Sequence, residues 1–173
     1  DEKLIIEATK TLNLRILIAP HDVSPANVSR LIHSMPFPAA RLSELSEAPL
    51  STKVVIVDSI GLLSILYAKG KIAYVGGGFG AGIHNTLEPL AHLKPVLFGP
   101  TYSKFPEAVE MVRLKAARSV ANAQELMDAI RFYKDPAHAG AAAKTANDYL
   151  VRNAGASALV TKYLLESIPY SSK

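Results

Sequence analysis

The stretch that decides the fold is "KIAYVGGGFGAGIHNTLEPLAHLKPVLFGP", residues 71–100. Two short apolar runs, at 71–77 and 94–100, enclose a glycine-rich turn and a segment with helical character. Both runs are continuous rather than alternating, which is typical of strands buried on both faces of a parallel sheet. The stretch therefore predicts a strand, a turn, a helix and a second strand parallel to the first.

The same alternation of strand and helix patterns extends over the rest of the chain. Further strands are predicted at 15–20, 53–58 and 117–120, with a short one near Arg41. Helices are predicted at 24–35, 60–70, 105–114 and 122–135. We therefore predict an α/β fold, a Rossmann-like doubly wound parallel sheet, formed by a single domain over residues 1–173 with a helical carboxyl-terminal segment at 136–168.

The composition excludes several classes of protein. The 173 residues are 49% apolar, which suffices for one domain with an ordinary core, and no apolar run reaches the length of a membrane span. The absence of cysteine from the sequence excludes a disulfide scaffold and thiolate metal sites. The net charge is +4, with Lys and Arg spread along the chain. We therefore expect anionic partners but no nucleic acid.

The glycine turn is rich in bare backbone and is followed by polar side chains. Five glycines lie within residues 76–82, and consecutive glycines can aim several amide N–H groups at an anion. Pro89 prevents a helix from beginning well before Asn85. His84, Asn85 and Glu88 are therefore expected at or near a helix amino terminus, which favours phosphate, and a carboxylate there can accept hydrogen bonds from a ribose. The turn thus predicts a nucleotide site.

Other interpretations of this region stay open. Asn85 and Glu88 also fit a capping box, with Asn85 as the cap and Glu88 reaching back to it. The pattern Gly-x-Gly-x-x-Ala from Gly76 matches a dinucleotide fingerprint, but the next strand ends without the acidic residue that would hold an adenosine ribose, which disfavours a nicotinamide or flavin oxidoreductase. His84 and His92 lie eight residues apart without a third ligand, so no metal site is predicted.

The turns after the other strands supply further candidates. Ligands of parallel α/β folds bind outside the carboxyl ends of the strands. His21 follows one predicted strand, and the turn from Asp58 to Gly61 follows another. Asp58 fits equally well as the cap of a helix over 60–68, so both interpretations of this carboxylate stay open.

Seven segments, in chain order, resemble the carboxyl-terminal half of the 3-deoxy-D-manno-octulosonic acid (Kdo) transferase family. They are "PH" (20–21), "VDSIGLLSILY" (57–67), "AYVGGGF" (73–79), "GIHNTLEPL" (82–90), "GP" (99–100), "KFPEA" (104–108) and "RNAGA" (152–156). The sequence departs from the family at Lys104, where Asn is common, so any contact of that Asn is not carried over. The family's domain also begins with a strand ahead of the first helix, which is expected before Asp1.

The resemblance implies one half of a GT-B glycosyltransferase with two Rossmann-like domains. This chain would be the donor-binding domain, and the acceptor domain with the general base would lie outside it. The implied donor is CMP-Kdo, the acceptor is a lipid A precursor bound through the absent domain, and no metal or other cofactor is expected. The full-length protein would act at the cytoplasmic face of the inner membrane of Gram-negative bacteria, anchored through its amino-terminal half. We expect the chain alone to be soluble and inactive.

The resemblance also implies donor-binding roles for residues at four turns. The glycine turn would face the donor phosphate, the polar residues after it would meet the ribose or phosphate end of CMP, and the remaining residues would border the nucleotide. The residues are His21, Ser43, Asp58, Gly61, Gly77, Gly78, Phe79, His84, Asn85 and Glu88. Two alternatives remain, namely a non-catalytic nucleotide-binding module and another GT-B nucleotide-sugar transferase.

Overall fold

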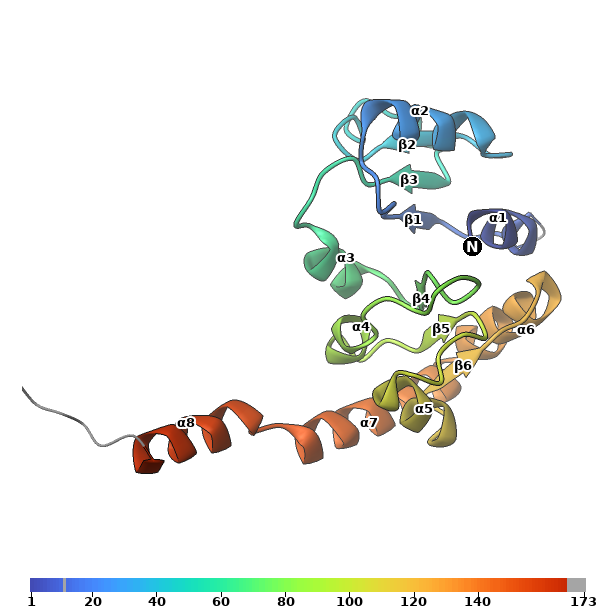
Figure 1. Ribbon diagram of the computed structural model, residues 1–173. Helices are drawn as coiled ribbons and strands as arrows, with labels where there is room; N and C mark the ends of the chain where they lie inside the picture. Colours follow the sequence, from blue (N-terminus) through green and yellow to red (C-terminus); the bar gives the residue numbers. More distant parts are fainter. Residues whose placement is uncertain (11, 168–173) are drawn as a thin grey trace, which may run out of the picture.

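The structure, a computed structural model, describes residues 1–10 and 12–167. Strands and helices alternate along the chain, and every strand pair is parallel (Figure 1). The strands are β1 (Ile16–Ile18), β2 (Ala39–Arg41), β3 (Val54–Ile56), β4 (Ala73–Val75), β5 (Val96–Phe98) and β6 (Ala117–Ser119). The helices are α1 (Glu2–Thr9), α2 (Pro25–Ser34), α3 (Leu63–Lys69), α4 (Leu87–Ala91), α5 (Pro106–Arg113), α6 (Ala123–Lys134), α7 (Pro136–Asn153) and α8 (Ala156–Ser167). The predicted α/β class is confirmed, including the short strand at Arg41.

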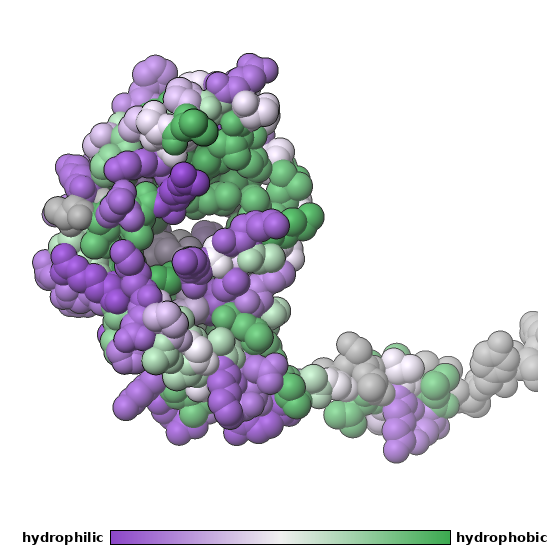
Figure 2. All heavy atoms as spheres, turned by 180° about the vertical axis from the view of Figure 1, so that it is seen from behind, coloured by the Kyte–Doolittle hydropathy of each residue, from purple (hydrophilic) through white to green (hydrophobic). Residues whose placement is uncertain are grey.

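The strands form two sheets rather than one continuous sheet. One has the order β1-β3-β2 and the other the order β4-β5-β6, each with three strands. Figure 1 shows β1 and β4 at the edges that face each other, and within the described residues these two strands do not pair. Figure 2 shows an opening between the two halves of the domain. The expected strand ahead of α1 falls outside the residues of this chain, so the structure does not test it.

The burial of the strands follows their place in the two sheets. All three residues of β5, the central strand of its sheet, are buried, as predicted. In β1, Ile16 and Ile18 pack toward the core beneath α2, but Leu17 is 42% exposed. Successive side chains of a strand point to opposite faces, and β1 is an edge strand whose second face is incompletely covered. The prediction that residues 15–20 are buried on both faces is therefore wrong.

Helices cover both faces of the β4-β5-β6 sheet. Val96 and Phe98 of β5 join one cluster of buried residues, which includes Met111 of α5. Leu97, which points to the other face, joins a second cluster with Leu126 of α6. This two-sided packing is the doubly wound arrangement that the alternating pattern predicts. It fixes the carboxyl ends of β4 and β5, from which the glycine turn and its neighbouring loop extend.

The predicted helix signals are also observed. The Ser24 hydroxyl caps α2 by accepting a hydrogen bond from the Asn27 amide at 3.4 Å. Gly155 has φ 107° and separates α7 from α8, so the predicted segment 136–168 forms two helices, with residue 168 outside the described residues. In Figure 1, α8 extends away from both sheets. None of the helices in the described part of the chain has the length and apolar character required to cross a bilayer.

Candidate functional site

The glycine turn follows β4 and folds back over its own beginning. The Gly80 amide donates to the Gly77 carbonyl at 2.9 Å, and the His84 amide donates to the Gly76 carbonyl at 3.0 Å. Gly77 has φ 92°, and a methyl group on it would lie 2.3 Å from the Gly82 carbonyl oxygen. A residue with a side chain does not fit there. The turn therefore requires glycine at this position for its own packing, and the predicted role of its amides toward an anion stays a prediction.

Gly78 brings the turn against the loop that follows β5. A methyl group on Gly78 would lie 2.5 Å from the Gly99 nitrogen. The Thr101 amide donates to the Gly78 carbonyl at 2.9 Å, which ties the two loops together. Phe79, the next residue, remains 42% exposed. The carboxyl ends of β4 and β5 therefore form one connected surface that carries an exposed aromatic ring.

The structure brings His21 and His84 together. Their rings are parallel within 1°, with centroids 6.1 Å apart. His21 follows β1 and His84 follows the glycine turn, so this pair joins the strand ends of the two sheets. His21 therefore lies beside His84, another of the predicted site residues, and the contact of either residue with a donor stays a prediction.

Asn85 and Glu88 form a side-chain pair at the start of α4. The Asn85 Oδ1 atom accepts the Leu87 amide at 2.9 Å, and its Nδ2 group donates to Glu88 Oε1 at 3.1 Å. The residue that precedes the helix is Thr86, and Glu88 contacts the side chain of Asn85 rather than its backbone amide. The predicted capping box is therefore confirmed only in part. Asn85 accepts a first-turn amide and Glu88 reaches back to it, but the helix begins one residue later and Glu88 meets the side chain of Asn85. Within the described residues the Glu88 carboxylate makes no other hydrogen bond.

Ser43 and Asp58 also meet, at the carboxyl ends of β2 and β3. Asp58 accepts the Ser43 amide at 3.2 Å and the Ser43 hydroxyl at 2.5 Å. These hydrogen bonds hold the pKa of Asp58 below its usual value. The next helix, α3, begins at Leu63 after Leu62, so the prediction that Asp58 caps it is wrong. Gly61 lies in the intervening turn with φ 91°.

Sequence reasoning missed Asp1 and Tyr74. The Tyr74 hydroxyl donates to Asp1 Oδ1 at 2.7 Å, and the Gly77 amide donates to Asp1 Oδ2 at 2.8 Å. Burial raises the pKa of Tyr74 to about 12, so the hydroxyl keeps its proton. No local pattern signals this contact, because the bonded residues are more than seventy positions apart.

Thr86 is a second residue that sequence reasoning missed. It is buried at the start of α4, and its hydroxyl has no hydrogen-bond partner among the described residues. Neither the position of Thr86 in the sequence nor the residues beside it distinguish it from a solvent-exposed threonine.

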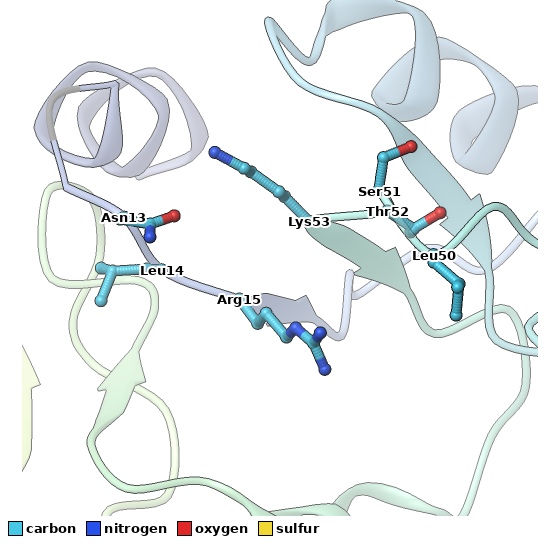
Figure 3. A pocket seen from close by; sticks show the side chains of 7 residues that line it. All are labelled: Asn13, Leu14, Arg15, Leu50, Ser51, Thr52 and Lys53. Carbon is cyan, nitrogen blue, oxygen red and sulfur yellow. The ribbon is translucent and has the colours of Figure 1, made fainter.

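A separate pocket lies at the opposite end of the β1-β3-β2 sheet (Figure 3). It is lined by Asn13, Leu14, Arg15, Leu50, Ser51, Thr52 and Lys53. These residues precede β1 and β3, whereas ligands of parallel α/β folds bind beyond the carboxyl ends of strands. In Figure 3 the side chains of Arg15 and Lys53 point away from each other. The pocket therefore offers no converging pair of cations for an anionic ligand.

Known proteins resemble this chain in sequence and in structure. No family model matches it. It is 35% identical over 121 residues to the 3-deoxy-D-manno-octulosonic acid transferase of Chlamydia pneumoniae and 33% identical over 119 residues to that of Haemophilus influenzae. The matches cover 67% and 65% of this chain but only 26% and 28% of those relatives, so the chain spans about a quarter of their length.

A solved structure extends the likeness to the fold. The C-terminal CMP-Kdo binding domain of WaaA from Acinetobacter baumannii is similar with a TM-score of 0.75 and 25% identity, over 86% of this chain and 82% of that one. The order of strands and helices and the glycine turn after β4 agree with the resemblance in sequence. The chain therefore belongs to the 3-deoxy-D-manno-octulosonic acid transferase family, in which it corresponds to the carboxyl-terminal domain.

Proposed function

We propose that the chain binds CMP-Kdo as the donor-binding half of an inverting glycosyltransferase that transfers Kdo to a lipid A precursor. The observation that carries the proposal is the glycine turn at the carboxyl end of β4, with the His21–His84 and Asn85–Glu88 pairs beside it. The similarity to a domain described as CMP-Kdo binding supports the choice of donor.

The residues of the site suit the departure of CMP. The amides of Gly78 and Phe79 have no acceptor among the described residues, so they are available to a phosphate oxygen. Fixed N–H groups stabilise the charge that develops on a leaving phosphate. The Glu88 carboxylate can accept hydrogen bonds from a ribose, and its bond to Asn85 holds it in place. The acceptor hydroxyl and the base that deprotonates it belong to the other domain in this proposal.

The test of this function is a titration of the chain with CMP, UDP and NAD. We expect saturable binding with a preference for CMP, because the glycine turn suits a single phosphate and no acidic residue follows β5 to hold an adenosine ribose. The same preparation should release no CMP from CMP-Kdo in a reaction coupled to glycolipid formation. Binding of NAD alone would contradict the proposal, and glycolipid formation by the isolated chain would contradict the division of labour between the domains.

Removal of divalent metal ions is expected to leave CMP affinity unchanged. Among residues 1–10 and 12–167, no three His, Asp or Glu side chains lie close enough together to hold a metal ion. Backbone amides can instead supply the positive potential for the phosphate. Calorimetric titration with CMP in a chelator and then in excess Mg²⁺ checks this expectation, and a large loss of affinity in the chelator would refute it.

A further inference from the structure

The carboxylate of Asp1 occupies a position in which the glycine turn could otherwise hold an anion. Its Oδ2 atom accepts the Gly77 amide at 2.8 Å, and its Oδ1 atom accepts the Tyr74 hydroxyl at 2.7 Å. A methyl group on Gly76 would lie 3.6 Å from Asp1 Oδ2 and 3.8 Å from His84 Cδ2. The carboxylate therefore lies against the bare backbone of the turn, on the side where the His84 ring is also found.

Asp1 has a second set of possible partners in its own helix. It is the N-cap residue of α1, and Asp is among the residues preferred at that position, because its side chain can accept the amides of the second or third helical residue. In this structure the side chain makes no such bond. The backbone of Asp1 is already fixed, because its carbonyl accepts the Ile5 amide at 3.0 Å. Rotation of the side chain alone would bring the carboxylate toward the amides of Lys3 and Leu4.

We propose that Asp1 is a displaceable placeholder for the donor phosphate, a residue that lowers the affinity of the site for ligands that bring a phosphate to the turn. In the empty site its carboxylate accepts the Gly77 amide. When the donor phosphate takes that amide, the side chain of Asp1 rotates and caps α1. The proposal rests on the proposed function, because it assigns the anion at the turn to the phosphate of CMP-Kdo.

The Asp1 carboxylate and the donor phosphate compete for the same amide, that of Gly77. A backbone N–H group makes one strong hydrogen bond, so the carboxylate and the phosphate cannot both use the Gly77 amide. Two negative groups at such short distance also repel each other. The cap on α1 returns part of the interaction that the displaced carboxylate loses.

The consequence is a lower affinity of the turn for every ligand that brings a phosphate to it. A nucleotide offsets this penalty through the contacts of its ribose and base. Inorganic phosphate has no such contacts, so it occupies the turn only at a higher concentration than it would need without the carboxylate.

The central experiment is the Asp1→Asn variant, titrated with CMP, inorganic phosphate and cytidine at one ionic strength and with the same amino terminus throughout. The substitution keeps the size of the side chain and removes its charge. We expect CMP and phosphate to bind about three- to tenfold more tightly, with cytidine affinity unchanged. The matched control is Glu2→Gln, because the neighbouring Glu2 carboxylate pairs with Arg30 at 3.1 Å rather than with the turn. It should leave all three affinities unchanged.

A second variant separates a placeholder from a residue that only supports the turn. Tyr74→Phe removes the hydroxyl that holds Asp1 Oδ1, so it should also tighten CMP binding, by about two- to threefold. If Asp1 and Tyr74 only stabilise the turn, both variants will weaken CMP binding, and the proposal is overturned. Equal changes for CMP and cytidine, or no change in Asp1→Asn, overturn it as well.

Amide NMR provides a readout of the rotation itself. CMP should shift the resonances of Lys3 and Leu4 in the unsubstituted chain by more than in Asp1→Asn, because only a carboxylate forms a charged cap on α1. The absence of any such difference contradicts the proposal. If the unsubstituted chain binds no CMP, the proposed function fails, and the phosphate titration of Asp1→Asn still decides whether Asp1 blocks the turn.

Discussion

The substitution Gly78→Ala is expected to lower the free energy of unfolding by about 2–4 kcal/mol. The added methyl group would lie 2.5 Å from the Gly99 nitrogen and 2.6 Å from the Gly99 Cα atom. Both atoms belong to the backbone, so no side chain can rotate away to make room. The loops after β4 and β5 would have to separate, at the expense of the bond between the Thr101 amide and the Gly78 carbonyl. Urea denaturation followed by circular dichroism measures the loss.

The turn itself provides the control for this prediction. A methyl group on Gly80 would meet only the Gly77 carbonyl oxygen, at 3.6 Å, which is an ordinary contact. Gly80→Ala should therefore change the free energy of unfolding by no more than about 0.5–1 kcal/mol. Equal losses in the two variants would show that the turn depends on glycine flexibility in general. A stable Gly78→Ala protein would contradict the close approach of the two loops.

Patterns within one element predict that element well. The continuous apolar run at 94–100 predicts β5, which is buried on both faces because it is the central strand of its sheet. Ser24 followed by Pro25 predicts the start of α2, because the cap and the first helical residue act on amides only a few residues away. In such cases the residues that determine the structure lie next to one another in the sequence.

Contacts between distant segments were not predictable in the same way. Asp58 fits a helix cap when its neighbours alone are considered, but it pairs with Ser43, fifteen residues before it. The Gly77 amide is taken by Asp1, and nothing near either residue indicates this. The division into two sheets is likewise a matter of which strands pair, and strand pairing leaves no mark in the apolar pattern of a single strand.

The candidate site combines contacts that local patterns predict with contacts between distant segments. The resemblance selected ten residues as a group, and the structure brings six of them into the pairs His21–His84, Ser43–Asp58 and Asn85–Glu88. The approach of Glu88 to Asn85 follows from their spacing of three residues. The other two pairs could not be predicted, because they depend on how the ends of separate strands meet. The contact of each residue with a donor stays a prediction, since pairs of polar side chains at a strand end can also serve the fold alone.

The Glu88→Gln variant distinguishes donor binding from a role in the fold alone. We expect it to weaken CMP binding about 10- to 100-fold, because a charge-assisted hydrogen bond contributes roughly 1.5–3 kcal/mol. Stability should change by at most about 1 kcal/mol, because the Gln carbonyl oxygen can still accept the Asn85 side-chain amide that Glu88 accepts at 3.1 Å. Calorimetric titration with CMP and thermal melting of the same preparation provide both measurements.

The matched control is Glu107→Gln in α5. Glu107 is the second residue of its helix, as Glu88 is of α4, so both substitutions remove one negative charge from a first helical turn. Any effect of the helix dipole is therefore common to the two variants. If Glu88 binds the donor, only Glu88→Gln loses CMP affinity. If the two variants retain the affinity of the unsubstituted chain, the pairing of Glu88 with Asn85 serves only to hold the start of α4, and the ribose contact must come from another residue at these strand ends.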